Sequence, residues 1–195
     1  GLFNCKTTQE NTKWKGQSAV KAVSTNTRPI QKQYKGIFNL ENDLFVTNNF
    51  DGARLNGITR INDTLITALI TPENTPINPS PWYAFKIWSK EAKDIYINLT
   101  YLNNVRHRYY PKTSNDGKNW NIIDTKNYKL LETDTLESNT IVSKVAQLKL
   151  KISSDTLWVA AQEVITSKDN KKWIESLAQK KHVTNKIIGL SKEKR

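Results

Sequence analysis

Residues 72–88 read PENTPINPSPWYAFKIW and belong to the most informative stretch of the chain. Its four prolines favour an extended backbone, so the segment before Trp82 is expected to be a stiff loop that leads into a strand. Side chains alternate between the two faces of a strand. We therefore expect Trp82 and Trp88 to lie on the face opposite the core, which takes the apolar side chains Tyr83, Phe85 and Ile87.

Short segments with the character of β-strands occur along most of the chain, separated by turn residues such as Asn62-Asp63. The segment VAQLKLKI at 145–152 alternates apolar and polar residues, with its lysines on the solvated face. This pattern predicts a mainly β fold, an antiparallel β-sandwich. The expected strands are 37–40, 44–46, 53–61, 65–70, 82–88, 95–101, 121–123, 128–131, 141–152 and 156–160.

The two ends of the chain differ from this middle part. Residues 1–35 are mostly polar and lack a strand or helix period, so we expect a polar N-terminal tether. Residues 36–166 form the expected sandwich domain. Residues 167–195 are expected to be a helix and a linker, with N-cap candidates at 167–170, a helix at 171–181 and an apolar face made by Trp173, Ile174, Leu177 and Ala178.

The composition excludes several classes of protein. The net charge is +12, but of the 30 basic residues only six are arginine, the residue best suited to reading base edges and phosphates. No nucleic-acid-binding motif is present, so we expect no nucleic-acid partner. A single cysteine excludes an intrachain disulfide, and no apolar run is long enough to span a bilayer.

Two stretches carry a resemblance to a known family. Residues 50–55 (FDGARL), 72–74 (PEN) and 76–85 (PINPSPWYAF) resemble the N-terminal β-sandwich domain of M14 zinc carboxypeptidases, in the branch of the cytosolic-type enzymes and their bacterial relatives. Residues 188–195 (IGLSKEKR) resemble the segment Ile-Gly-x-Ser-x-Glu-Gly-Arg near the start of the catalytic domain in that family. Lys194 stands where the family has glycine, so this second match is imperfect.

The resemblance implies a noncatalytic accessory domain. Its partner would be its own catalytic domain, which follows in the chain and removes C-terminal residues from a peptide substrate. The candidate contacts with that domain or with its substrate cleft are Trp82, Trp88, Asn78 and Arg54. Large aromatic side chains dominate such interfaces energetically, and Arg54 is expected to pair with a nearby carboxylate.

The metal site of such an enzyme is expected outside this segment. The family's first zinc motif is His-x-x-Glu, and neither His107 nor His182 is followed by that pattern. Zinc carboxypeptidases need two His and one Glu as ligands together with a general base. We therefore expect no cofactor and no catalytic residues here, and zinc in the catalytic domain.

The sequence near the N-terminus suggests a membrane attachment. Leu2 to Cys5 resembles the lipoprotein box of bacteria, although Asn4 occupies a position where a small residue is usual. Cys5 is the candidate lipidation site, and a stray surface cysteine is the alternative. The expected location is the bacterial cell envelope or the exterior, with the cytoplasm left open.

A second function stays open. Residues 114–120 (SNDGKNW) follow the pattern Ser-x-Asp-Gly-x-x-Trp, which resembles a hairpin of carbohydrate-binding and discoidin-like sandwich modules. The alternative to an accessory domain is therefore a carbohydrate-binding or protein-binding module of a cell-envelope protein. Its candidate ligand-binding loop contains Arg106, His107, Arg108 and Trp120. Asp-Gly also explains a tight turn without any ligand, and a tryptophan that follows a turn is often a packing residue.

Overall fold

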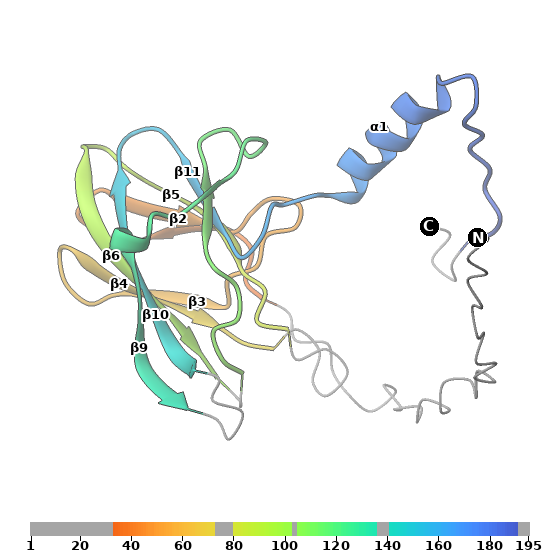
Figure 1. The fold of residues 1–195 in the computed structure, drawn as a ribbon. Helices are drawn as coiled ribbons and strands as arrows, with labels where there is room; N and C mark the ends of the chain where they lie inside the picture. Colours follow the sequence, from red (N-terminus) through yellow and green to blue (C-terminus); the bar gives the residue numbers. More distant parts are fainter. Residues whose placement is uncertain (1–32, 73–79, 103–104, 136–140, 191–195) are drawn as a thin grey trace, which may run out of the picture.

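The computed structural model describes residues 33–72, 80–102, 105–135 and 141–190, which form a β-sandwich followed by a helix (Figure 1). The strands are β1 Ile37–Asn39, β2 Leu44–Thr47, β3 Gly57–Arg60, β4 Leu65–Ile70, β5 Ala84–Ser89, β6 Lys93–Tyr101, β7 Lys112–Ser114, β8 Asn121–Ile122, β9 Tyr128–Thr135, β10 Ile141–Ile152 and β11 Leu157–Ala160. A short 3-10 helix, η1, spans Thr125–Asn127, and helix α1 spans Ser167–Ala178. The mainly β sandwich expected from the sequence is confirmed.

The strands form two sheets. One has the order β1-β2-β5-β11-β7-β8 and is called sheet A here, and the other has the order β3-β4-β6-β10-β9 and is called sheet B. All described pairs are antiparallel except β4 and β6, which run parallel. The parallel pair arises because the chain leaves sheet B after β4, forms β5 in sheet A and then returns as β6, and parallel neighbours need such a crossover.

The core lies between the two sheets and takes alternate residues from each strand. In β5 the buried side chains include Phe85 and Ile87, and Tyr83 just before the strand is also fully buried, so the core face expected for this stretch is confirmed. In β10 the residues Ala146, Leu148 and Leu150 point inward, while Gln147 and Lys149 face outward. Burial of such apolar side chains contributes about 25 cal/mol per Å² of surface removed from water and is the main source of stability.

Some boundaries differ from the sequence-based expectation. The sequence does not predict strand β7, because Lys112-Thr113-Ser114 is short and polar. The strand forms by pairing with β11. Residues 53–56 are not a strand, although Arg54 makes a single bridge to Ala84. Helix α1 begins at Ser167 rather than near 171, because Thr166 and Asp169 form a capping box at its N-terminus.

The sandwich also holds the residues that precede β1. The fully buried Asn48 donates a hydrogen bond from Nδ2 to the carbonyl of Tyr34 (2.6 Å) and accepts one at Oδ1 from the backbone N–H of Gly36 (3.0 Å). The Gln33 side chain accepts from the N–H of Leu55 and donates to the carbonyl of Ala53. The chain is therefore already attached to the domain at Gln33, within the segment expected to be a tether.

Candidate interdomain surface

Arg54 joins the loop that follows β4 to the start of β5. Its backbone exchanges two hydrogen bonds with Ala84, at 2.9 and 3.0 Å. Its guanidinium is buried, and Nη2 donates to the carbonyls of Thr71 (3.2 Å) and Pro72 (3.0 Å). Both carbonyls lie where the proline-rich segment begins, so Arg54 holds the backbone at the start of that segment. The carboxylate partner expected for Arg54 stays a prediction.

Trp82 lies beside Arg54. Its indole is half-buried, packs against the edge of the core, and donates from Nε1 to the carbonyl of Gly52 at 3.1 Å. The two side chains line a hollow of about 410 Å³, which is called the junction hollow here. The other residues that line it are Gln33, Gly52, Ala53, Glu163, Val164 and Ile165. The structure therefore brings two predicted contact residues together where the chain leaves the sandwich for α1.

The charged groups of the junction hollow are already engaged within the chain. Glu163 forms an ion pair with Lys112, and the hydrogen bond from Lys112 lowers the pKa of the Glu163 carboxyl. The guanidinium of Arg54 is bound to backbone carbonyls. Ile165, in contrast, is 76% exposed at the rim. An engaged charge pair and an exposed apolar rim suit packing against another surface better than they suit acid–base chemistry.

Helix α1 continues this surface away from the sandwich (Figure 1). None of its residues is buried, Trp173 is 61% exposed, and Ile174 and Leu177 on the same side are half-buried. An ion pair between Lys168 and Asp51, with Nζ and Oδ2 2.9 Å apart, joins the first turn of the helix to the sandwich.

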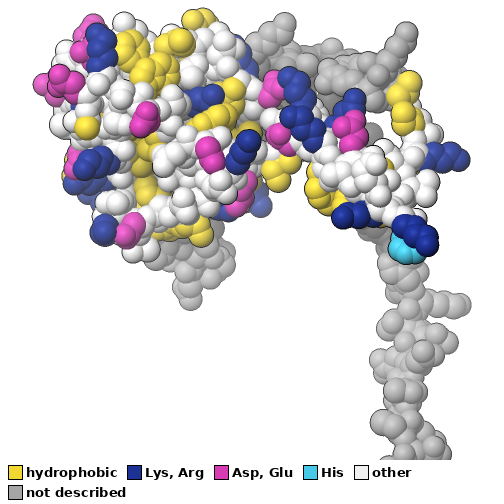
Figure 2. Space-filling view, turned by 90° about the horizontal axis from the view of Figure 1, so that it is seen from above, with side chains coloured by type: hydrophobic (Ala, Val, Ile, Leu, Met, Phe, Trp, Pro, Cys, Tyr) yellow, Lys and Arg dark blue, Asp and Glu magenta, His cyan; other side chains and the backbone are white. Residues whose placement is uncertain are grey.

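The segment after α1 is apolar as well as basic. Figure 2 shows yellow hydrophobic side chains among dark blue Lys and Arg side chains on the part that extends from the sandwich. Ile187, Ile188 and Leu190 in this segment are all largely exposed. Exposed apolar surface on this scale commonly marks a site of contact with a partner.

Trp88 lies apart from the junction hollow, on the outer face of sheet A. Its ring stacks on Phe45, with centroids 5.5 Å apart and planes 17° apart. Its neighbour in β5 on the same face, Lys86, holds its ammonium 3.9 Å from the ring centroid of Trp158 and 4.9 Å from that of Phe50. Both tryptophans thus avoid the centre of the sandwich, and the outer face of sheet A carries a strip of aromatic rings.

Sequence reasoning did not find this strip, which includes Phe50 and Trp158. A signal was present, because alternation along 156–160 places Trp158 opposite Val159, a residue typical of the core. What the sequence does not give is the pairing of β11 with β5, which places Trp158 directly opposite Lys86.

The basic loop proposed as a second site is divided between different surroundings. His107 is largely buried between Tyr101 and Tyr128, and its Nδ1 lies 2.7 Å from the Tyr101 hydroxyl. Its Nε2 is buried and has no hydrogen-bond partner among the described residues, and burial lowers the pKa of His107 to about 4. The neighbouring Arg108 is exposed and lies over the Tyr109 ring. Arg106, on the other side of His107, is half-buried.

Trp120 belongs to a different cluster on sheet A. Its ring meets the edge of Trp158, with centroids 6.3 Å apart. The expected turn before it is confirmed: Asp116 accepts hydrogen bonds from the backbone N–H groups of Lys118 and Asn119, which lower the pKa of its carboxyl. No described contact joins Trp120 to His107, so the residues proposed for one ligand-binding loop have separate partners.

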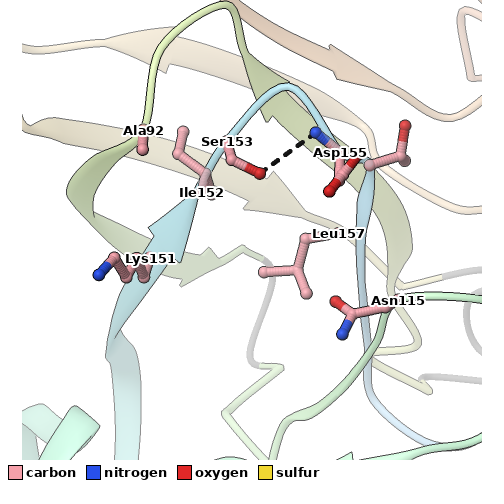
Figure 3. Close-up of a pocket in the computed structure, with 8 residues that line it drawn as sticks. Ala92, Asn115, Lys151, Ile152, Ser153, Asp155 and Leu157 are labelled. Carbon is pink, nitrogen blue, oxygen red and sulfur yellow. Dashed lines mark hydrogen bonds between the residues drawn. The ribbon is translucent and has the colours of Figure 1, made fainter.

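Another hollow, of about 610 Å³, lies beside the turn between β10 and β11 (Figure 3). Its lining is mixed, with the apolar Ile152 and Leu157 beside Asn115 and the carboxylate of Asp155. The Ser153 hydroxyl accepts a hydrogen bond from the N–H of Asp155 at 3.2 Å and so shapes the turn. A single carboxylate with no histidine or cysteine beside it does not make an acid–base or nucleophilic pair.

Two of the residues proposed from the sequence, Asn78 and Cys5, lie outside the described residues. Among the residues that the structure describes, no three His, Cys, Asp or Glu side chains are grouped as metal ligands would be. The helices of that part of the chain are too short or too polar to cross a bilayer.

Comparisons with known proteins give matches to solved structures. No family model matches the sequence, and neither does a curated protein. A chain assigned as a carboxypeptidase A from Shewanella denitrificans is 16% identical with a TM-score of 0.56, and the match covers 77% of this chain and 37% of that one. A metallo-carboxypeptidase from Burkholderia cenocepacia is 13% identical with a TM-score of 0.55, over 78% and 37%.

A metallo-carboxypeptidase from Pseudomonas aeruginosa, solved with (2-guanidinoethylmercapto)succinic acid, is 14% identical with a TM-score of 0.52, over 77% of this chain and 38% of that one. At these identities the likeness is one of fold. The present chain thus spans a little over a third of the length of the carboxypeptidase chains it matches.

Proposed function

We propose that this chain is the noncatalytic N-terminal β-sandwich domain of a zinc metallocarboxypeptidase. The observation that carries the proposal is the fold match, which takes in 77% of this chain but only 37% of a carboxypeptidase chain. A share of that size suits one accessory domain within a larger enzyme. The sequence resemblance at 72–85 points to the same family.

In this proposal the junction hollow, the apolar side of α1 and the segment after it contact the catalytic domain. Trp82 and Ile165 are the candidate anchors on the sandwich, and Trp173 is the candidate anchor on the helix. Exposed aromatic and aliphatic side chains of this kind supply most of the binding energy of protein interfaces. By packing there the domain would form one wall of the cleft that receives the C-terminus of a peptide substrate.

The chemistry would belong to the catalytic domain. Zinc would be bound there and would activate a water molecule for hydrolysis of the last peptide bond. The role of the present residues would be structural. Attachment to a membrane through Cys5, and a location in the bacterial cell envelope, are part of the same proposal.

Two preparations test this proposal. One is the 195-residue chain, and the other is the complete product of its gene. We expect the complete product to contain about one zinc per molecule and to release C-terminal residues from peptides. We expect the 195-residue chain to do neither. Stoichiometric zinc in the short chain, measured by elemental analysis, or a complete product with no zinc and no hydrolysis, would contradict the proposal.

The contact surface is tested separately in the complete product. Trp173→Asp places a charge on the exposed side of α1, and we expect it to lower the melting temperature or the activity of the complete product. Lys171→Gln, two residues earlier and on the opposite side of the same helix, changes the net charge by the same amount and is the matched control. Equal behaviour of the two variants would mean that Trp173 makes no such contact.

A further inference from the structure

A small hollow on the outer face of sheet B collects positive charge. It has a volume of about 210 Å³ and lies where η1 meets β9, β10 and β6. Three of the side chains that line it are Lys126, Lys129 and Lys149. The remaining residues of the lining are Tyr96, Asn127, Tyr128 and Gln147, so the lining contains no carboxylate.

Strand register brings these residues together. Lys129 in β9 pairs with Gln147 in β10, and Lys149, two residues further along the same face, pairs with Tyr96 in β6. Lys126 comes from η1, which leads directly into β9. The lysines therefore stand on neighbouring backbone positions of paired elements, and their convergence is set by the sheet.

Two of the three lysines have a carboxylate partner outside the hollow. Lys149 pairs with Asp94 and Lys126 pairs with Asp124, each with Nζ and carboxylate oxygen 3.1 Å apart. The hydrogen bond that Lys149 donates to Asp94 raises the pKa of Lys149. Lys129 takes part in none of the ion pairs formed by the described residues. Lys129 thus brings to the hollow a positive charge that none of the described carboxylates offsets.

Polar groups beside the lysines are held in place. The Gln147 side chain donates from Nε2 to Oδ1 of Asn98 at 2.8 Å, which fixes its amide on the floor of the outer face. Asn127 is the last residue of η1, and its backbone N–H donates to the carbonyl of the capping Asp124 at 2.9 Å. An anion in the hollow would meet ammonium donors on several sides and an ordered polar floor.

We propose that this hollow binds an oxyanion, the group shared by phosphate, sulfate and the carboxylate of an acidic side chain. Charge-assisted hydrogen bonds from lysine to such oxygens are stronger than neutral ones, and the ligand would offset the charge of Lys129. A volume of 210 Å³ takes one such group rather than a folded partner. This binding site is independent of the function proposed above.

The test is a titration followed by two-dimensional ¹H–¹⁵N NMR at constant ionic strength. Sodium phosphate and a five-residue glutamate peptide are the two ligands, added to the 195-residue chain. We expect saturable shifts of the amide signals around Lys129 and Gln147. Saturation by phosphate but not by the peptide identifies a phosphate or sulfate site, and saturation by the peptide identifies an acidic side chain as the ligand.

Two variants of exposed lysines distinguish binding in this hollow from attraction of the anion by the net charge of the protein. Lys129→Gln is expected to weaken binding about fivefold, as loss of one ammonium donor would do. Lys118→Gln, in the turn after β7, removes the same charge elsewhere and is expected to leave the affinity unchanged. Shifts that do not saturate, or an equal affinity in both variants, would overturn the proposal.

Discussion

Lys86 places its ammonium 3.9 Å above the ring of Trp158, on the strand that pairs with its own. The same ammonium lies 4.9 Å from the ring of Phe50, which meets Trp158 edge to face at 4.6 Å between centroids. A cation thus lies between two aromatic rings on the outer face of sheet A. The lysine ties the loop that contains Phe50 to the strands beneath it.

This cluster predicts an effect of Lys86 that an ordinary surface lysine does not have. Lys86→Gln removes the cation and is expected to lower the free energy of unfolding by ~0.5–1 kcal/mol, while Lys86→Arg keeps the interaction. Urea unfolding followed by tryptophan fluorescence measures the difference. Lys118→Gln is the matched control, and a loss of equal size in that variant would show that net charge alone is responsible.

Gly117 predicts a second effect at the same cluster. Its φ of 71° lies in the left-handed region, and a Cβ built on it would meet the Trp158 ring at 2.8 Å. Gly117→Ala therefore adds backbone strain and a clash, and we expect a loss of roughly 1–2 kcal/mol in stability.

A matched glycine is available in the same chain. Gly189 has nothing within 4 Å of its Cβ position, so Gly189→Ala is expected to leave the unfolding midpoint in urea unchanged. If Gly117→Ala is as stable as Gly189→Ala, the packing of the turn on Trp158 is not as described.

His107 predicts a dependence of stability on pH. Its pKa is lowered by burial to about 4 in the folded chain, below the value of 6.5 expected when unfolded. Above pH 6.5 the His107 imidazole is neutral in both the folded and the unfolded chain, so its burial does not reduce the stability of the fold. As the pH falls toward 4 the unfolded chain takes up a proton that the folded chain does not, so the folded state loses roughly 3 kcal/mol.

The histidine contribution can be separated from that of the carboxylates. Unfolding in urea between pH 7 and pH 4 is compared in the parent chain, in His107→Gln and in His182→Gln, since His182 is exposed after α1. We expect the free energy of unfolding to fall less between pH 7 and pH 4 in His107→Gln than in the parent chain. In His182→Gln we expect the same fall as in the parent chain. The same slope in all three proteins would mean that His107 is not the group that titrates.

Replacement of Arg54 is expected to lower the stability of the domain, because Arg54 holds the backbone at the start of the proline-rich segment. Arg54→Met keeps much of the buried apolar stem but leaves the carbonyls of Thr71 and Pro72 without their charged donor. We expect a loss of ~2–3 kcal/mol in the free energy of unfolding, because two hydrogen bonds from a charged, buried donor are removed. Arg60→Met, which removes ion pairs with the exposed carboxylates of Glu41 and Asp63, is the control and is expected to cost less than about 1 kcal/mol.

Alternation of side chains in the sequence was enough to predict most strands and the inward faces of β5 and β10. It was also enough to place Trp88 on the outer face of β5, since strand period determines the face. Strand β7 was missed because its three polar residues carry no apolar alternation and it exists through its partner β11. The start of α1 was misplaced by about one turn because Thr166 caps it before the apolar residues begin.

The candidate surface was predictable in part. Local patterns were enough to predict the strand with aromatic side chains that follows Pro81, because side-chain alternation is a local property of the chain. The expected loop at 73–79 lies outside the described residues. The tertiary structure was needed to show that Trp82 and Arg54 line one hollow, that Lys86 lies on Trp158, and that three lysines line the hollow beside β9. Those contacts join residues distant along the chain, and they depend on strand order and register, which no local pattern specifies.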